Sequence, residues 1–256
     1  MNTPNTPNDP ATPTPSITPP SAVPGPPPPL PAGLPADAGI AQVLEALLKH
    51  PLQLVMELQR KGSARTAVAL ALTAFIALAV YGVIIGTFSG GSQLFLAPLK
   101  VSLGSVVSVL ICLPSLFIFA CLAGAEISLR GLVGALCAMM ALTALLLVGF
   151  APVAWVFSQS TDSIAVMGTL HLFFWLIALA FGLRLLTTLM SVWRVSDRLH
   201  LRVWKFIFVL VCLQMTTALR PIIGTSADVL PREKKFFVAH WVENLFRGAR
   251  TSSVAD

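Results

Sequence analysis

Charge is the property that this chain has least of. Only 11% of its 256 residues are Asp, Glu, Lys or Arg, whereas soluble domains carry about 25%. This deficit argues against an ordinary soluble domain. The net charge of +6 is modest, and the sequence has no dense basic face interleaved with aromatic residues. We therefore predict that nucleic acid is not a partner.

Motifs for metal binding and catalysis are also missing. The four cysteines form no Cys-x-x-Cys pair and no cysteine–histidine ligand spacing, so neither a zinc site nor a disulfide framework is predicted, and no cofactor is expected. The sequence has no His-Glu-x-x-His, no Gly-x-Gly-Asp and no P-loop. We predict that the protein is not an enzyme. A membrane enzyme with an unrecognised site remains a further hypothesis.

The chain instead contains a series of long apolar runs. Residues 66–88 carry no charge, and roughly 20 helical residues cross a hydrocarbon core about 30 Å thick. Every backbone N–H and C=O has to be paired within a segment in lipid, so these runs are predicted to be helices. We predict an all-α integral membrane bundle within residues 63–224. Its five transmembrane helices are predicted at residues 66–88, 101–124, 131–157, 164–186 and 203–219.

Basic residues gather on one side of the predicted spans. Lys and Arg accumulate on the cytoplasmic side of membrane proteins, so we predict a cytoplasmic amino terminus and an outward carboxyl terminus. The outward loops then hold only Lys100 and Asp162. The inward set is Arg60, Lys61, Arg65, Arg130, Arg184, Arg194, Arg198, Arg202 and Lys205. Because the tail after residue 219 is also basic, a four-span bundle with residues 203–219 at the membrane surface is the alternative.

Residues 1–36 form a proline-rich tail that holds 14 of the chain's 20 prolines. Proline fixes φ and donates no hydrogen bond, so we predict a disordered segment with polyproline II character. The tail lacks the basic start and apolar core of a cleavable signal peptide, so the first span is expected to act as its own anchor. The prolines at 26–31 could bind an aromatic-lined groove of SH3, WW or EVH1 type. A simple spacer is the other interpretation.

Two amphipathic segments flank the predicted bundle. In residues 37–62 apolar residues recur at three- and four-residue spacing, which predicts an amphipathic helix, with Asp37 as its N-cap and an interruption or kink at Pro51. We predict that this helix lies at the membrane interface, and a helix that docks a cytosolic partner is the alternative. Residues 225–256 form a basic, aromatic tail, which is expected at the headgroup level.

Polar residues inside the spans are the candidate functional residues. They are His171 in the fourth predicted span, Gln214 and Arg220 at the fifth, and Glu126 at the end of the second. These residues could line a polar path or bind an anionic headgroup. Alternatively, His171 and Gln214 form hydrogen bonds between helices, while Arg220 reaches the interface. No carboxylate lies well inside a span, and this favours the second interpretation.

Two resemblances to known families add to these predictions. The layout of five spans, a long cytosolic amino-terminal region and a short far-side carboxyl terminus is similar to that of the Yip1-like membrane proteins. Residues 214–224, which read QMTTALRPIIG, resemble the Q-M-T-x-x-L-R-P-x-x-G stretch of a group of uncharacterised bacterial multi-pass membrane proteins. This second resemblance covers about the last fifth of the chain and implies a bacterial cytoplasmic membrane. It brings no established activity.

These features together favour a non-enzymatic role. We predict a membrane scaffold or accessory subunit whose partners are the lipid bilayer and a protein bound through the proline-rich tail or the amphipathic helix. A small channel or transporter-like protein, with a polar path near His171, Gln214 and Arg220, is the alternative.

Overall fold

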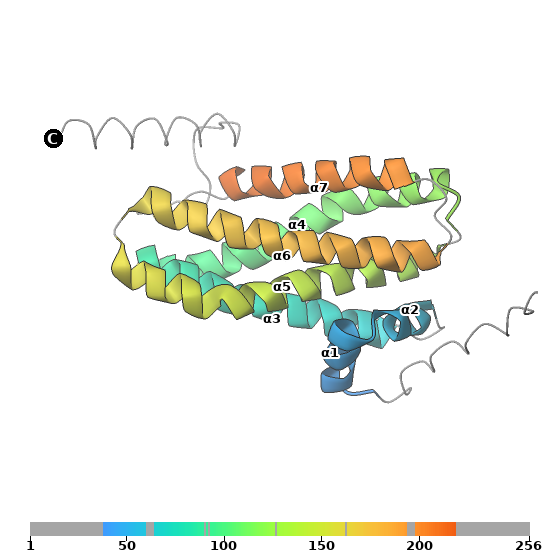
Figure 1. The fold of residues 1–256 in the computed structure, drawn as a ribbon, viewed down its shortest axis with the longest axis horizontal. Helices are drawn as coiled ribbons and strands as arrows, with labels where there is room; N and C mark the ends of the chain where they lie inside the picture. Colours follow the sequence, from blue (N-terminus) through green and yellow to red (C-terminus); the bar gives the residue numbers. More distant parts are fainter. Residues whose placement is uncertain are drawn as a thin grey trace, which may run out of the picture. The chain divides into compact units, whose positions relative to one another are not determined.

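A computed structural model describes residues 38–59, 64–89, 91, 93–125, 127–161, 163–193 and 198–218. Every regular element in these residues is a helix, which confirms the all-α fold class (Figure 1). The predicted disordered tail and the basic carboxyl-terminal tail lie outside the described residues. The helices are α1 (Ile40–Lys49), α2 (Pro51–Gln59), α3 (Ala64–Ser89), α4 (Gln93–Leu122), α5 (Leu129–Ser160), α6 (Ile164–Val192) and α7 (Arg198–Ala218).

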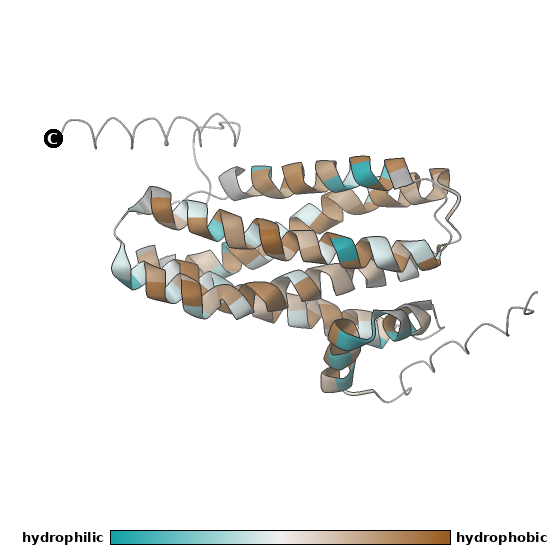
Figure 2. Cartoon of the chain, in the orientation of Figure 1, coloured by the Kyte–Doolittle hydropathy of each residue, from teal (hydrophilic) through white to brown (hydrophobic). Residues whose placement is uncertain are grey.

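Four of the described helices, α3 to α6, are long and apolar enough to cross a membrane. Figure 2 shows apolar residues along their whole length. Many of their large apolar side chains are exposed, such as Val68 at 64% and Phe95 at 80%, and a lipid environment would cover them. The fifth predicted span corresponds to α7, which is not among these four helices. Its crossing of the membrane stays a prediction.

Helices α3 to α7 pack in the order α7, α4, α3, α5, α6. Helix α3 packs against α4 and α5, α6 packs against α5, and α7 packs against α4. The connections between consecutive helices from α3 to α7 are short, so within the bundle each helix runs antiparallel to the next. We call the end where α3, α5 and α7 begin and α4 and α6 finish the proximal end, and the opposite end the distal end.

Helices α3 and α4 cross closely in the distal part of the bundle. A Cβ atom at Gly82 would lie 2.5 Å from the Pro98 Cα and 2.9 Å from its nitrogen, so only glycine allows the two backbones to approach this closely. The Ser102 hydroxyl, which is fully buried, donates to the Phe75 carbonyl of α3 at 3.3 Å. In lipid the hydrophobic effect does not drive helices together, so small residues and hydrogen bonds between helices are the contacts expected there.

The start of α4 differs from the prediction. A polar break was expected up to Lys100, yet α4 begins at Gln93 and Lys100 is only 4% exposed within it. The apolar residues at 94–99 continue the helix, in which Ala97 is fully buried and Pro98 lies against Gly82 of α3, whereas Phe95 and Leu99 are exposed. The expectation that Lys100 lies in an outward loop was therefore wrong.

The amphipathic segment forms two helices rather than one. The break falls at His50 and Pro51, as the sequence predicted, but α1 begins at Ile40 with Gly39 in the N-cap position. Asp37 lies outside the described residues. Both helices pack at the proximal end of the bundle, α1 on α3 and α5, and α2 on α3, α5 and α6 (Figure 1).

Candidate functional site

The most distinctive polar feature inside the bundle is a pair formed by Tyr81 and His171. Helix α3 supplies Tyr81 and α6 supplies His171, and their side chains are 2% and 7% exposed. The Tyr81 hydroxyl lies 2.8 Å from the His171 Nδ1 atom. The two rings meet edge to face, with centroids 5.6 Å apart and an angle of 84° between their planes. This geometry is that of a strong, buried hydrogen bond between two helices.

The second ring nitrogen of His171 has no such bond. Its Nε2 atom is buried and makes no hydrogen bond within the described residues. If the Tyr81 hydroxyl donates to Nδ1, the proton of the neutral ring lies on Nε2, and if Nδ1 donates, Nε2 is a free acceptor. In either case a polar atom is left unpaired in an apolar environment, which typically costs about 1–3 kcal/mol. This atom is the reason to consider the pair as more than a structural contact.

The pair lies in the distal part of the bundle. Tyr81 comes 8 residues before the end of α3 and His171 comes 7 residues after the start of α6. The two residues therefore lie about 12 Å and about 10 Å from the distal ends of their helices. The two depths match because both helix termini lie at the distal end. Gly82, the residue next to Tyr81, lies at the α3–α4 crossing, so the position of the tyrosine is fixed by backbone packing.

The chemistry available to this pair is limited. Within the described residues no three His, Cys, Asp or Glu side chains gather as metal ligands would. The Tyr81 hydroxyl and the His171 Nδ1 atom form one hydrogen bond, and the His171 Nε2 atom can accept or donate one more. The pair therefore suits structural bonding or the binding of a small polar group. In this part of the chain it lacks the carboxylate that would orient the imidazole as a general base.

The structure describes two of the four predicted site residues, His171 and Gln214. His171 bonds to α3, whereas Gln214 is a half-buried residue of α7, the helix that packs against α4. Arg220 and Glu126 lie outside the described residues. A polar path shared by His171, Gln214 and Arg220 stays a prediction.

Tyr81 and Trp204 are among the residues that sequence reasoning missed and that join helices through polar bonds. Tyr81 is the only tyrosine of the chain, and a single tyrosine in an aliphatic run was the available signal. Trp204 of α7 is fully buried, and its Nε1–H donates to the Cys112 carbonyl at 3.1 Å and to the Ser115 hydroxyl at 3.2 Å. The Trp204 ring also stacks on Phe208, with centroids 5.1 Å apart. Trp204 thus links α7 to α4 through two polar contacts.

The fold and its four apolar helices are those of an all-helical, multi-pass membrane protein. No known protein family, curated protein or solved structure matches the chain. The two resemblances drawn from its layout and from residues 214–224 therefore stay predictions.

Proposed function

We propose that this protein is a non-enzymatic membrane scaffold or accessory subunit that recruits a protein partner through its amino-terminal region. The observation that carries the proposal is the firm docking of α1 and α2 on the transmembrane bundle. Leu54 and Leu58 of α2 are 0% and 2% exposed. The amino-terminal region is thereby attached to the membrane body at a defined place.

The contact between Leu58 and Gly134 explains why this docking is specific. A Cβ atom at Gly134 would lie 2.6 Å from the Leu58 Cδ2 atom, so the glycine leaves a recess on α5 that the leucine fills. Gly134 and Ala138 have the small-residue spacing that permits close helix approach, and here that space is used by α2. A helix fixed in this way can hold a bound partner at a defined place relative to the membrane bundle, which a scaffold requires.

The outward side of α1 offers a surface for a partner. Ile40 and Leu48 are 56% and 59% exposed, and Glu45 and Lys49 of the same helix form an ion pair at 3.0 Å. An exposed apolar pair flanked by charges fits recognition by a helical groove of another protein. The proline-rich tail, residues 1–36, precedes this helix and is the second candidate for recruitment.

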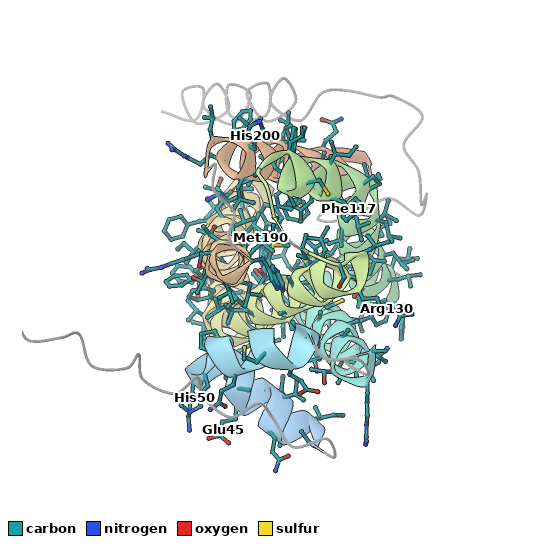
Figure 3. The ribbon with its side chains drawn as sticks, turned by 90° about the vertical axis from the view of Figure 1, so that its right-hand side faces the viewer. Glu45, His50, Phe117, Arg130, Met190 and His200 are labelled. Carbon is teal, nitrogen blue, oxygen red and sulfur yellow. The ribbon has the colours of Figure 1, made fainter. Side chains whose placement is uncertain are left out.

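The proposed orientation follows from the distribution of charge. The exposed cations Arg65, Arg130, Arg184 and Arg202 belong to the proximal halves of four different helices; Figure 3 views the bundle from this end. Since cations favour the cytoplasmic side, we place the proximal end, α1 and α2 in the cytoplasm. We further propose that α7 is the fifth span, that the carboxyl terminus lies outside and that the membrane is a bacterial cytoplasmic membrane.

The test is quantitative affinity isolation from membranes after mild cross-linking. Four forms are compared: the full chain, a form lacking residues 1–36, Leu48→Glu, and Gln42→Glu as the matched control. Gln42 is exposed on the same helix, so its substitution adds the same charge without touching the apolar pair. We expect a partner that is lost with the deletion or with Leu48→Glu and is kept with Gln42→Glu. A partner profile that is identical in all four inserted forms would refute recruitment through this region.

One observation favours a second candidate function. The unpaired Nε2 of His171 is what a small channel or transporter would present to a polar solute. In that case the same residue, rather than the amino-terminal region, would carry the function. Solute flux in reconstituted vesicles distinguishes the two, because a scaffold gives no flux above that of empty vesicles.

A further inference from the structure

A second polar cluster lies at the opposite end of α6 from His171. The Lys205 ammonium of α7 donates to the Thr187 hydroxyl of α6 at 3.4 Å. Arg184 lies one turn before Thr187 on the same helix and is exposed. Arg202, one turn before Lys205, is exposed as well. The Lys205–Thr187 bond thus joins α6 and α7, and an exposed arginine lies about one helical turn to either side of it, Arg184 on α6 and Arg202 on α7.

We place the edge of the bilayer core at the level of Arg184. Residues 164–183 of α6 carry no Asp, Glu, Lys or Arg, and as a helix they span about 30 Å, which equals the thickness of the hydrocarbon region. Arg184 is the next residue, so it falls where phospholipid phosphates lie. Lys205 reaches the same level, because its bond to Thr187 joins the two helices there.

The cations of this cluster are not neutralised by the described part of the protein. Within the described residues the carboxylates belong to Glu45 and Glu57 of α1 and α2, and Glu45 is paired with Lys49. Neither Arg184 nor Lys205 contacts a carboxylate in this part of the chain. Two cations that no described carboxylate compensates attract an anion, and the guanidinium fork of arginine matches the geometry of phosphate oxygens.

We propose that Arg184, Thr187 and Lys205 form a site for the phosphate of a phospholipid with a net negative headgroup. Arg184 donates two parallel N–H bonds, Lys205 supplies a second positive charge, and the Thr187 hydroxyl positions the lysine. The acyl chains then lie along the apolar surface of α6, where Phe181 is 52% exposed. The site is separate from the Tyr81–His171 pair and from the proposed recruitment surface.

Native mass spectrometry of the full chain in neutral detergent tests the proposal. The protein is titrated with a short-chain phosphatidylglycerol and, in parallel, with phosphatidylcholine of the same chain length. We expect Arg184→Gln and Lys205→Gln each to weaken binding of phosphatidylglycerol by about five-fold, with little effect on phosphatidylcholine. Arg130→Gln is the matched control, since Arg130 is an exposed cation at the same end of the bundle, on α5 (Figure 3).

Each of the following results would contradict the proposal. An equal loss of phosphatidylglycerol affinity in Arg130→Gln would mean that any cation at the proximal end supports binding. Equal affinity for phosphatidylcholine would mean that the charge of the headgroup is not recognised. Displacement of the lipid by millimolar inorganic phosphate would assign the site to free phosphate instead. If Arg184→Gln does not fold, Arg184→Lys keeps the charge and removes the fork, and an unchanged affinity in that variant would exclude bidentate recognition.

Discussion

Replacing Tyr81 by phenylalanine removes one hydroxyl group from the bundle and leaves its packing volume almost unchanged. The hydroxyl bonds to the His171 Nδ1 at 2.8 Å in a buried environment. Hydrogen bonds between membrane helices contribute about 0.6 kcal/mol on average and about 1.7 kcal/mol at most. The substitution also leaves both ring nitrogens of His171 without a partner. We therefore expect Tyr81→Phe to lower the free energy of unfolding by about 1–2 kcal/mol.

The double-mutant cycle isolates the bond itself. His171→Leu leaves the Tyr81 hydroxyl unpaired, whereas the double variant Tyr81→Phe/His171→Leu removes every polar atom of the pair. The double variant should therefore lose less stability than the sum of the two single variants, by about 0.6–1.7 kcal/mol. Unfolding is measured by titrating mixed micelles with a denaturing detergent and following tryptophan fluorescence.

A control on the same helix shows whether the coupling is specific. Thr73 of α3 carries a hydroxyl that bonds to the Ala69 carbonyl of its own helix, at 2.8 Å. Thr73→Val combined with His171→Leu should be additive within about 0.5 kcal/mol. Additivity of the Tyr81 and His171 variants to the same degree would refute a bond between them. Solute flux that is present in the wild type and lost in a stably folded Tyr81→Phe would refute the scaffold proposal.

Three further substitutions test the packing contacts. Gly82→Ala should lower stability by about 1–3 kcal/mol, because its Cβ meets backbone atoms of Pro98 that cannot rotate away; a detergent melt measures this loss. Trp204→Phe should cost about 1 kcal/mol in the same melt, since the Cys112 carbonyl loses a donor. Leu58→Ala should cost about 2–3 kcal/mol of local stability and release α2, which limited proteolysis detects as faster cleavage near the amino terminus.

Each of these substitutions has an outcome that would contradict its reasoning. A Cβ atom added at Gly149 would meet no neighbouring atom within 4 Å, so Gly149→Ala should be neutral, and an equal loss there would remove the explanation for Gly82. A Trp204→Phe variant as stable as the wild type would show that the indole bond contributes nothing. Unchanged proteolysis of Leu58→Ala would show that α2 is held elsewhere.

The membrane-spanning part of the fold could be predicted because its signal is local. A charge-free run such as residues 66–88 identifies α3 without any knowledge of its neighbours. The start of α4 was misplaced because a single charge, Lys100, was assigned to a loop. Its burial depends on the neighbouring helices, which a linear pattern does not describe.

Only one of the two residues of the candidate site, His171, could be predicted from the sequence. His171 stands out as an ionisable residue in an apolar run, whereas its partner Tyr81 lies 90 positions away. The link between Trp204 and Cys112 spans 92 positions. Helical periodicity gives the face on which a side chain lies but not the helix that faces it, so neither pair could be derived from spacing alone.

The distribution of polar groups along α6 bears on the choice between a scaffold and a channel. Residues 172–183 separate His171 from Arg184, and all of them are apolar, so the two polar positions are about 20 Å apart along the helix. Phe174 fills part of this interval by stacking on Phe150 of α5, with centroids 4.9 Å apart. A hydrogen-bonded path needs a polar group roughly every 3 Å. The intervening hydroxyl of Thr143 on α5 is already bonded to the Met139 carbonyl of its own helix at 2.9 Å. An interval of this length and composition favours helix–helix bonding over conduction along α6.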